Sequence, residues 1–294
     1  MTDRVVDISD GPAALSVADE RLTIRRGDET HRIPLGEVGV VVVAHPAVTY
    51  THAVLAGLAR HGGALIACGP DRMPAAMLLP VAGHHAQAER FDRQAHASAP
   101  TRKRLWQQLV RAKIKAQARL LEAVHGSDAG LAALISRVRS GDPQNVEATA
   151  ARRYWGALFG KAFRRRHDAE DHNRNLNYGY AVLRGVVARA VCAAGLHPSL
   201  GLHHHNRYDA YCLASDLTEP FRPVVDRAVF EWVGEHGTDA PFDKSAKAHL
   251  LHALIARYNI RGEWRTLFDV LSRTAASLAA VFEGRRKALL LPEI

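Results

Sequence analysis

The sequence has few cysteines and no long apolar run. Cys68, Cys192 and Cys212 are too widely spaced for a disulfide framework or a paired-cysteine zinc site, which is typical of proteins in a reducing cytoplasm. The longest apolar stretch, at 38–43, is far below the roughly 20 residues that a membrane span requires. The opening MTDRVVDISD lacks the apolar region of a secretory signal. We therefore expect a soluble, cytoplasmic protein that does not enter a membrane.

The sequence is also short of acidic residues. It contains 30 Asp and Glu against 39 Lys and Arg, which gives a formal net charge of +9. This excess favours a polyanionic partner, with nucleic acid first and an acidic membrane surface second, although a merely basic soluble protein would show the same balance. The sequence further lacks the zinc motif H-E-x-x-H, the nucleophile motif G-x-S-x-G and a complete phosphate-binding loop.

Hydrophobic patterning predicts an α+β fold with two domains. Residues 1–82 contain short runs rich in Val, Ile and Thr between turn formers, which predicts antiparallel strands, a strand buried on both faces at 38–43 and one helix at 51–61. Helix-forming residues dominate from 83 onward. We expect an N-terminal β-strand-rich domain, 1–82, followed by an all-α helical domain, 83–294. Gly179 and Gly185, inside the long apolar helix of LNYGYAVLRGVVARAVCAAG, would let another helix approach closely.

The helix predicted at 102–124 carries charge of one sign. Its apolar residues recur every three or four positions and predict a buried stripe: Leu105, Leu109, Ala112, Ala116, Leu120 and Val124. Its other face is basic: Arg102, Lys103, Arg104, Arg111, Lys113, Lys115 and Arg119. Arg164, Arg165 and Arg166 form a second basic cluster. Phosphate contact and plain solvation explain such one-signed faces equally well.

A glutamate lies on the apolar face of the helix predicted in NVEATAARRYWGALFGKAF. We expect Asp142 to cap this helix and Pro143 to stand at its first position. Glu147 shares a face with Ala150 and Tyr154. A carboxylate in this position is costly unless a cation, a metal or a hydrogen-bond network meets it. The alternative is an acid that only benefits from the helix dipole.

The segment GLHHHNRYDAYCLASDLTEPFRP, residues 201–223, has the highest density of metal-binding side chains. It carries His203, His204, His205, Asp216, Glu219 and Arg222. Imidazole and carboxylate groups suit a divalent cation, and a guanidinium can bind an anionic substrate through two hydrogen bonds. A surface histidine run and acids at a helix N-terminus would be the simpler interpretation.

Taken in order, NVEATAARRYW, LNYGYAVLRG and the histidine segment resemble the CRISPR-associated integrase family, the catalytic subunit of the spacer-acquisition complex, and most closely its type II branch. The resemblance covers the whole chain and implies an N-terminal β domain that pairs subunits and a helical catalytic domain. It also implies a metal site of one glutamate, one histidine and one downstream acid. At matching positions these are Glu147, His204 and Glu219, while His203 and His205 leave the choice of histidine open. Asp216 would either take the ligand role itself or support the ligands through hydrogen bonds, and His205 would have the supporting role.

The resemblance implies a DNA integrase and endonuclease that uses Mg²⁺ or Mn²⁺. The metal polarises a phosphodiester and activates the 3′ hydroxyl of a short duplex, which attacks a strand of the CRISPR repeat, and water in its place gives nuclease activity. The expected DNA-binding residues are Arg102, Lys103, Arg104, Arg111, Lys115, Arg164, Arg165, Arg166 and Arg222. The family's prokaryotic members act as homodimers with a small ferredoxin-like partner, and in type II systems alongside the guide-RNA effector nuclease.

Two other functions are compatible with the residues. The first is a DNA-binding assembly scaffold whose metal site is inactive or structural. The second is a metallohydrolase that acts on a small anionic substrate, although this function leaves the basic helices unexplained.

Overall fold

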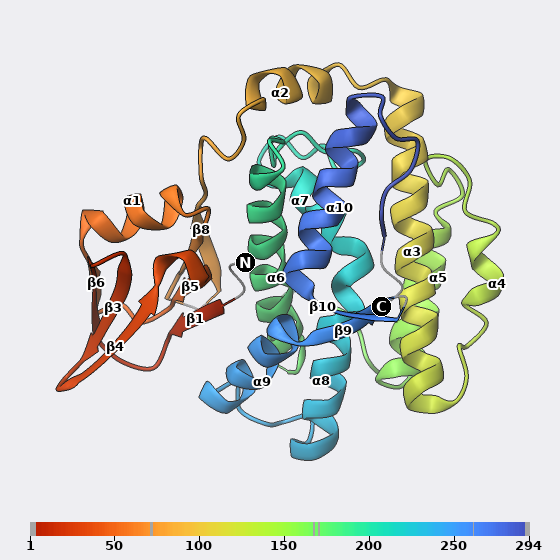
Figure 1. Cartoon of the computed structure of the whole chain (residues 1–294). Coiled ribbons are helices and arrows are strands. Elements are labelled where there is room, and N and C mark those ends of the chain that lie inside the picture. Colours follow the sequence, from red (N-terminus) through yellow and green to blue (C-terminus); the bar gives the residue numbers. More distant parts are fainter. Residues whose placement is uncertain (1–3, 71–72, 167, 170, 261, 292–294) are drawn as a thin grey trace.

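The protein has an α+β fold, as the sequence predicts. The structure, a computed structural model, describes residues 4–70, 73–166, 168–169, 171–260 and 262–291. Figure 1 shows the strand-rich N-terminal part on one side of helix α6 (Asn173–Ala193) and most of the other helices on its opposite side. None of the helices in these ranges combines the length and the hydropathy that crossing a membrane requires.

The N-terminal part contains two sheets of four strands each, within the described residues. In the first sheet the order is β4 (Glu29–Pro34), β3 (Arg21–Arg26), β2 (Ala13–Ala18) and β6 (Val48–Tyr50). In the second sheet the order is β1 (Arg4–Ile8), β5 (Val38–Val43), β7 (Ala64–Cys68) and β8 (Pro74–Leu78). The antiparallel pairing of β2, β3 and β4 is confirmed. The prediction is wrong for β1, which pairs with β5 in parallel. The alternation of residues indicates which side chains share a face of a strand, but it does not indicate whether the neighbouring strand runs parallel or antiparallel.

Strand β5 joins the two hydrophobic cores, because all six of its residues are buried as predicted. Val41 packs in a core between the two sheets, which helix α1 (His52–Arg60) also enters through Leu58. Val40 and Val42 face the larger core, which the helices build. The strand-rich part is therefore packed firmly on α6. The division at 82 and 83, and the pairing of subunits through residues 1–82, remain predictions.

Helices make up most of the chain beyond residue 83. They are α2 (Gln87–Ala95), α3 (Ala99–His125), α4 (Ala132–Ile135), α5 (Val146–Leu158), α6, α7 (Cys212–Thr218), α8 (Arg222–His236), α9 (Lys244–Ile255) and α10 (Leu267–Phe282). The expectation of an all-α part is wrong at one place, where β9 (Arg257–Ile260) and β10 (Glu263–Thr266) form an antiparallel hairpin. Strands of four residues are too short to show a period of two against the helical pattern around them.

The two glycines of α6 allow close packing. A Cβ on Gly179 would lie 2.4 Å from Cγ1 of Val225 on α8, so the predicted approach of another helix is confirmed there. A Cβ on Gly185 would lie 2.4 Å from Cδ1 of Ile66, so at this position the neighbour is strand β7 and not a helix. The missing side chains let α6 lie between the sheet and the helices.

Helix α3 is buried over more of its surface than the sequence predicts. Leu105, Leu109, Ala116 and Leu120 are buried as expected, whereas Ala112 and Val124 are half-buried. The predicted basic face is wrong for Lys113, which is 8% exposed. Helix α5 and the short 3-10 helix η2 (Glu219–Phe221) pack against α3. Helix α3 therefore does not have one buried face and one exposed face. Its neighbours also cover part of the face that carries the basic residues.

Candidate active site

One lysine nitrogen joins two of the carboxylates selected from the sequence. Nζ of Lys113 on α3 lies 2.6 Å from Oε2 of Glu219 at the start of η2, and it also donates a hydrogen bond to Oε1 of Glu147 on α5. Because both oxygens contact the same nitrogen, they lie no more than about 6 Å apart, the sum of two hydrogen-bond lengths. The cation that Glu147 requires on its half-apolar helix face is Lys113.

The first turn of α5 fixes the position of Glu147. The helix begins after Asn145, whose side chain accepts a hydrogen bond from the backbone nitrogen of Ala148. The carboxylate of Asp142 accepts from the backbone nitrogens of Val146 and Glu147, each at 3.0 Å. The predicted capping arrangement is therefore partly wrong: Asp142 does bind the first turn, but Asn145 is the capping residue and Pro143 precedes the helix. Two side chains share the unpaired amides here.

Two cations hold Glu219 in its ionised form. Its Oε1 lies 2.9 Å from a terminal nitrogen of Arg222, three residues along the chain, while Lys113 contacts its other oxygen. Burial by itself would raise the pKa of Glu219, but the charges of Lys113 and Arg222 lower that pKa to about 2. The pKa of Lys113 is raised, because Glu219 and Glu147 together outweigh the effect of its burial. Glu219, Lys113 and Arg222 are therefore all charged near neutral pH.

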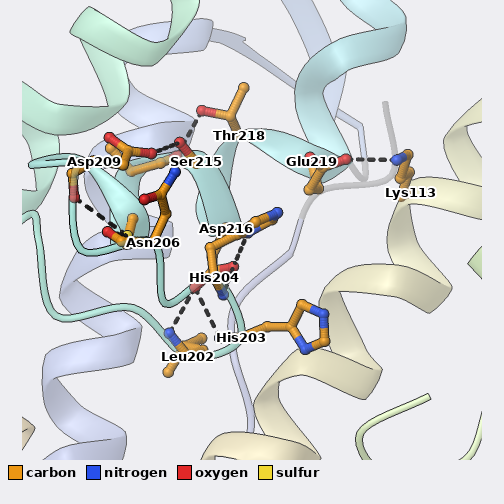
Figure 2. A network of polar contacts seen from close by, with 12 residues as sticks. Lys113, Leu202, His203, His204, Asn206, Asp209, Ser215, Asp216, Thr218 and Glu219 are labelled. Atoms are coloured by element: carbon orange, nitrogen blue, oxygen red, sulfur yellow. Dashed lines mark hydrogen bonds and ion pairs between the residues drawn. The ribbon is translucent and has the colours of Figure 1, made fainter. Parts of the chain in front are cut away.

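A fully buried aspartate shapes the histidine segment. Asp216 on α7 accepts hydrogen bonds from the backbone nitrogens of Leu202, His203 and His204, and its Oδ1 lies 2.6 Å from Nδ1 of His204. Figure 2 shows this carboxylate facing the turn and Glu219 facing Lys113. The pKa of His204 is raised, mainly by the hydrogen bond to Asp216. Because Asp216 binds Nδ1, a cation would have to bind this ring through Nε2.

The three histidines have different surroundings. The ring of His203 stacks on Trp106 of α3 with centroids 4.2 Å apart, and His204 meets the same indole edge-on. Both histidines line a cavity with Glu147 and Glu219. His205 is exposed and lines a separate cavity with Arg102. The positions of the rings therefore favour His203 and His204 over His205 as partners of the two acids.

A buried carboxyl group, that of Asp226, also lines the cavity. Asp226 on α8 accepts hydrogen bonds from the hydroxyls of Tyr154, at 2.7 Å, and Tyr180. Burial raises the pKa of Asp226 to about 6. Arg222 lies over the Tyr180 ring, 4.6 Å from its centroid. Asp226 thus anchors α5, α6 and α8 to one another at the cavity.

The cavity that these groups enclose has a volume of about 330 Å³. Its lining includes Glu147, Glu219, His204, Lys113 and Arg222. Among the residues that the structure describes, no three His, Cys, Asp or Glu side chains are grouped closely enough to hold a metal ion as they stand. Within the cavity, the ammonium of Lys113 stands between the two acids.

The residues selected for DNA binding are spread over several surfaces. Arg165 and Arg222 line the cavity, and Arg102 lies beside His204 in the neighbouring one. Three others are exposed on α3: Lys103, Arg104 and Lys115. The rest have local partners. Arg111 donates to the carbonyl of Val138, Arg164 to carbonyls of its own loop, and Arg166 pairs with Asp168.

Sequence reasoning missed several residues of the site. Lys113 was assigned to a solvent-facing surface, although it follows Leu109 by four positions and precedes Ala116 by three, a spacing that fits the buried stripe. Trp106 is buried beside the histidines, and nothing in its spacing predicts that contact. Asp226 carried no signal beyond its place in a helix of mixed charge, since its two tyrosine partners come from distant segments.

Comparisons with known proteins identify the family. The family model described as CRISPR associated protein Cas1 matches residues 8–261. The CRISPR-associated endonuclease Cas1 of Neisseria meningitidis serogroup C (strain 8013) is 36% identical over 298 residues, which span 100% of this chain and 97% of that protein. Two solved structures share the fold. A casposase bound to integration product has a TM-score of 0.78 at 18% identity, over 98% of this chain and 92% of the other. The crystal structure of TtCas1 has a TM-score of 0.68 at 19% identity, over 96% and 98%. The chain therefore belongs to the CRISPR-associated Cas1 family.

Proposed function

We propose that the protein is a metal-dependent DNA integrase and endonuclease that joins the 3′ hydroxyls of a short duplex to a CRISPR repeat. The observation that carries this proposal is the convergence of Glu147 and Glu219 on one cationic nitrogen in a cavity that His204 also lines. The relative in Neisseria meningitidis is named an endonuclease, and the casposase was solved with its integration product. Both names support phosphodiester chemistry as the activity to propose for this chain.

The donor set fits a hard or borderline divalent cation. Glu147 and Glu219 would supply oxygen ligands, and His204 would supply Nε2 while Asp216 holds its other nitrogen. Lys113 supports the fit, because the two acids already converge on a positive charge. Two oxygens and one imidazole nitrogen suit Mn²⁺ at least as well as Mg²⁺. A cation bound here would polarise the scissile phosphodiester and lower the pKa of the attacking 3′ hydroxyl.

The protein's own groups orient the reactants. Arg222 is held against Glu219 and over Tyr180, so its guanidinium is positioned to bind a phosphate oxygen beside the acids. The attacking 3′ oxygen forms a new bond to phosphorus while the bond to the leaving 3′ oxygen of the repeat strand breaks. The attacking hydroxyl loses one proton and the leaving oxygen gains one. Water as the attacking group would give hydrolysis at the same position.

A second cavity supports an extended anionic substrate. It has a volume of about 330 Å³, and the described residues that line it include Arg165, Arg184 and Arg222 but no acid. Among the side chains that the structure describes, Nε of Arg184 and Nε of Arg222 are buried without a hydrogen-bond partner. A buried N–H group without an acceptor is costly, so these two Nε atoms favour phosphate groups in this cavity. Arg222 forms part of both linings, which would lead a DNA strand from one cavity to the other.

Solved relatives also support a proposal for the protein and DNA partners of this chain. Solved relatives of this fold include a Cas6-RT-Cas1–Cas2 complex, whose matching chain is 16% identical with a TM-score of 0.74 over 97% of this chain and 35% of that one, and a TtCas1–DNA complex. We propose a homodimer that works with a small ferredoxin-like partner on prespacer and repeat DNA in a prokaryotic cytoplasm. In the type II branch the effector nuclease would act alongside it.

The test is strand joining in vitro. The protein and its small partner are incubated with a labelled duplex bearing free 3′ ends and a supercoiled plasmid carrying a repeat, with and without Mn²⁺. Glu147→Gln and His204→Ala should abolish covalent joining, because each removes a ligand. Glu122→Gln, an exposed glutamate on α3, is the matched control and should join at the wild-type rate.

The same experiment separates the other functions. If Glu147→Gln and His204→Ala still join the duplex to the plasmid, the proposed site is wrong. If the wild-type protein binds duplex tightly but shows neither joining nor cleavage with any divalent metal, the protein is an assembly scaffold. Cleavage of a small phosphodiester without any duplex binding would indicate the metallohydrolase.

A further inference from the structure

Lys113 is the buried cation of the site. It extends from the middle of α3 into the cavity, and its nitrogen contacts one carboxylate from α5 and one from η2. With Arg222 on the other oxygen of Glu219, the group contains two acids and two cations. Its charges therefore balance within the protein. Removing Lys113 would leave two carboxylates facing each other in a partly closed cavity, which is strongly unfavourable.

The ammonium stands in the space that a metal ion would need. It lies 2.6 Å from Glu219, whereas a divalent cation bonds carboxylate oxygens at about 2.1 Å. The two acids cannot hold an ammonium and a divalent cation between them at once. The two positive charges would lie side by side with no room for water or protein atoms to screen their repulsion. Binding of one requires withdrawal of the other.

We propose that Lys113 is a built-in counterion that occupies the metal position when no divalent cation is bound and is displaced when one binds. This inference rests on the proposed function, because it requires Glu147 and Glu219 to be metal ligands. The flexible four-carbon stem of lysine permits the withdrawal, and the cavity beside Arg222 offers the space. The exchange keeps the acids paired and in place before metal arrives. Its cost is a weaker affinity for the metal.

The experiment compares Mn²⁺ binding to the full chain by isothermal titration and by the loss of the free-ion electron paramagnetic resonance signal. Lys113→Met should bind Mn²⁺ at least about tenfold more tightly than the wild type, because the competing positive charge is gone. Lys287→Met, an exposed lysine, is the matched control and should leave the affinity unchanged. Mn²⁺ should also raise the thermal midpoint of Lys113→Met much more than that of the wild type.

A Lys113→Met protein with the same Mn²⁺ affinity as Lys287→Met, or a weaker one, overturns the inference while leaving the metal site intact. If neither the wild type nor Lys113→Met binds Mn²⁺, both the inference and the proposed metal site fail. Where Lys113→Met does not fold, the wild type itself gives the answer: with ¹³C-labelled lysines, saturating Mg²⁺ should shift the resonance that Lys113→Gln lacks. An unmoved Lys113 resonance at saturating Mg²⁺ overturns the inference.

Discussion

Nδ1 of His204 lies 2.6 Å from Oδ1 of Asp216, and the same carboxylate accepts three backbone hydrogen bonds from the turn that carries the histidines. Asp216 is therefore the residue that orients His204, although it does not line the cavity with Glu147. One buried side chain fixes both the backbone of the turn and one nitrogen of the ring. Asp216 thus positions the ring of His204, while its role in supporting a metal ligand remains a prediction.

Asp216→Asn should lower both stability and activity. An amide has one acceptor oxygen where four donors now converge, so we expect a loss of about 2–3 kcal/mol in the free energy of unfolding. The joining rate should fall about 10- to 100-fold if His204 is the metal ligand proposed above, because residues that orient a metal ligand have effects of this size. Urea unfolding and the strand-joining assay measure the two effects. The exposed Asp239→Asn is the control, and equal behaviour of the two variants would contradict the positioning role.

Asp226 should make stability depend on pH. Burial raises its folded-state pKa from 3.8 to about 6. The hydrogen bonds from Tyr180 and Tyr154 and the charges of Arg222 and Lys113 lower this pKa, but burial has the larger effect. Between pH 3.8 and about pH 6, Asp226 thus keeps a proton in the folded protein that it has lost in the unfolded chain. This contribution to stability is fully present below pH 3.8 and is lost as pH rises through 6; it amounts to about 3 kcal/mol.

Asp226→Asn removes that dependence, because an amide does not titrate. Relative to the wild type, the variant should gain stability steadily as pH rises from 4 to 7, by up to about 3 kcal/mol. Urea unfolding at four pH values across this range measures the difference. A difference that stays constant with pH would show that Asp226 is not protonated in the folded protein.

Gly179→Ala should destabilise the contact between α6 and α8. The added Cβ would lie 2.4 Å from Cγ1 of Val225, so the helices must separate, at a cost of about 1–3 kcal/mol in the free energy of unfolding. Gly156→Ala is the matched control within α5, since its Cβ would meet no side chain or neighbouring element within 4 Å. That substitution should stabilise by about 0.5–1 kcal/mol. Adding Val225→Ala to Gly179→Ala should recover most of the loss, and failure to do so would place the strain elsewhere.

Arg184→Gln should weaken binding of DNA irrespective of its sequence. Arg184 lines the second cavity, together with Arg165 and Arg222, and its charge would contact a phosphate there. We expect the slope of log affinity against log salt to fall by about 1, because one fewer counterion is released. Fluorescence anisotropy with a labelled duplex at several salt concentrations measures the slope. Arg32→Gln on the exposed strand β4 is the control, and an equal effect of both substitutions would argue against a phosphate in this cavity.

The family could be predicted from the sequence, because its signature depends on residue types in a fixed order. The order of Glu147, the glycine-containing helix and the histidine segment predicts the family, which the comparisons confirm. The strand-rich beginning and helical remainder follow from patterns of two and of three to four residues, which are local properties of the chain. The parallel partner of β1 and the β9–β10 hairpin could not be predicted in the same way, because strand direction depends on distant segments and short strands give little signal.

The sequence by itself determined which side chains are candidates for binding a metal and a phosphate. Only the tertiary structure decided how they meet: that Lys113 lies between Glu147 and Glu219, that Asp216 binds the turn and does not line the cavity, and that Asp226 accepts hydrogen bonds from two tyrosines. The physical reason is that burial and charge pairing are set by neighbours from separate helices. The electrostatic energy of a group depends on those neighbours and not on its position in the chain.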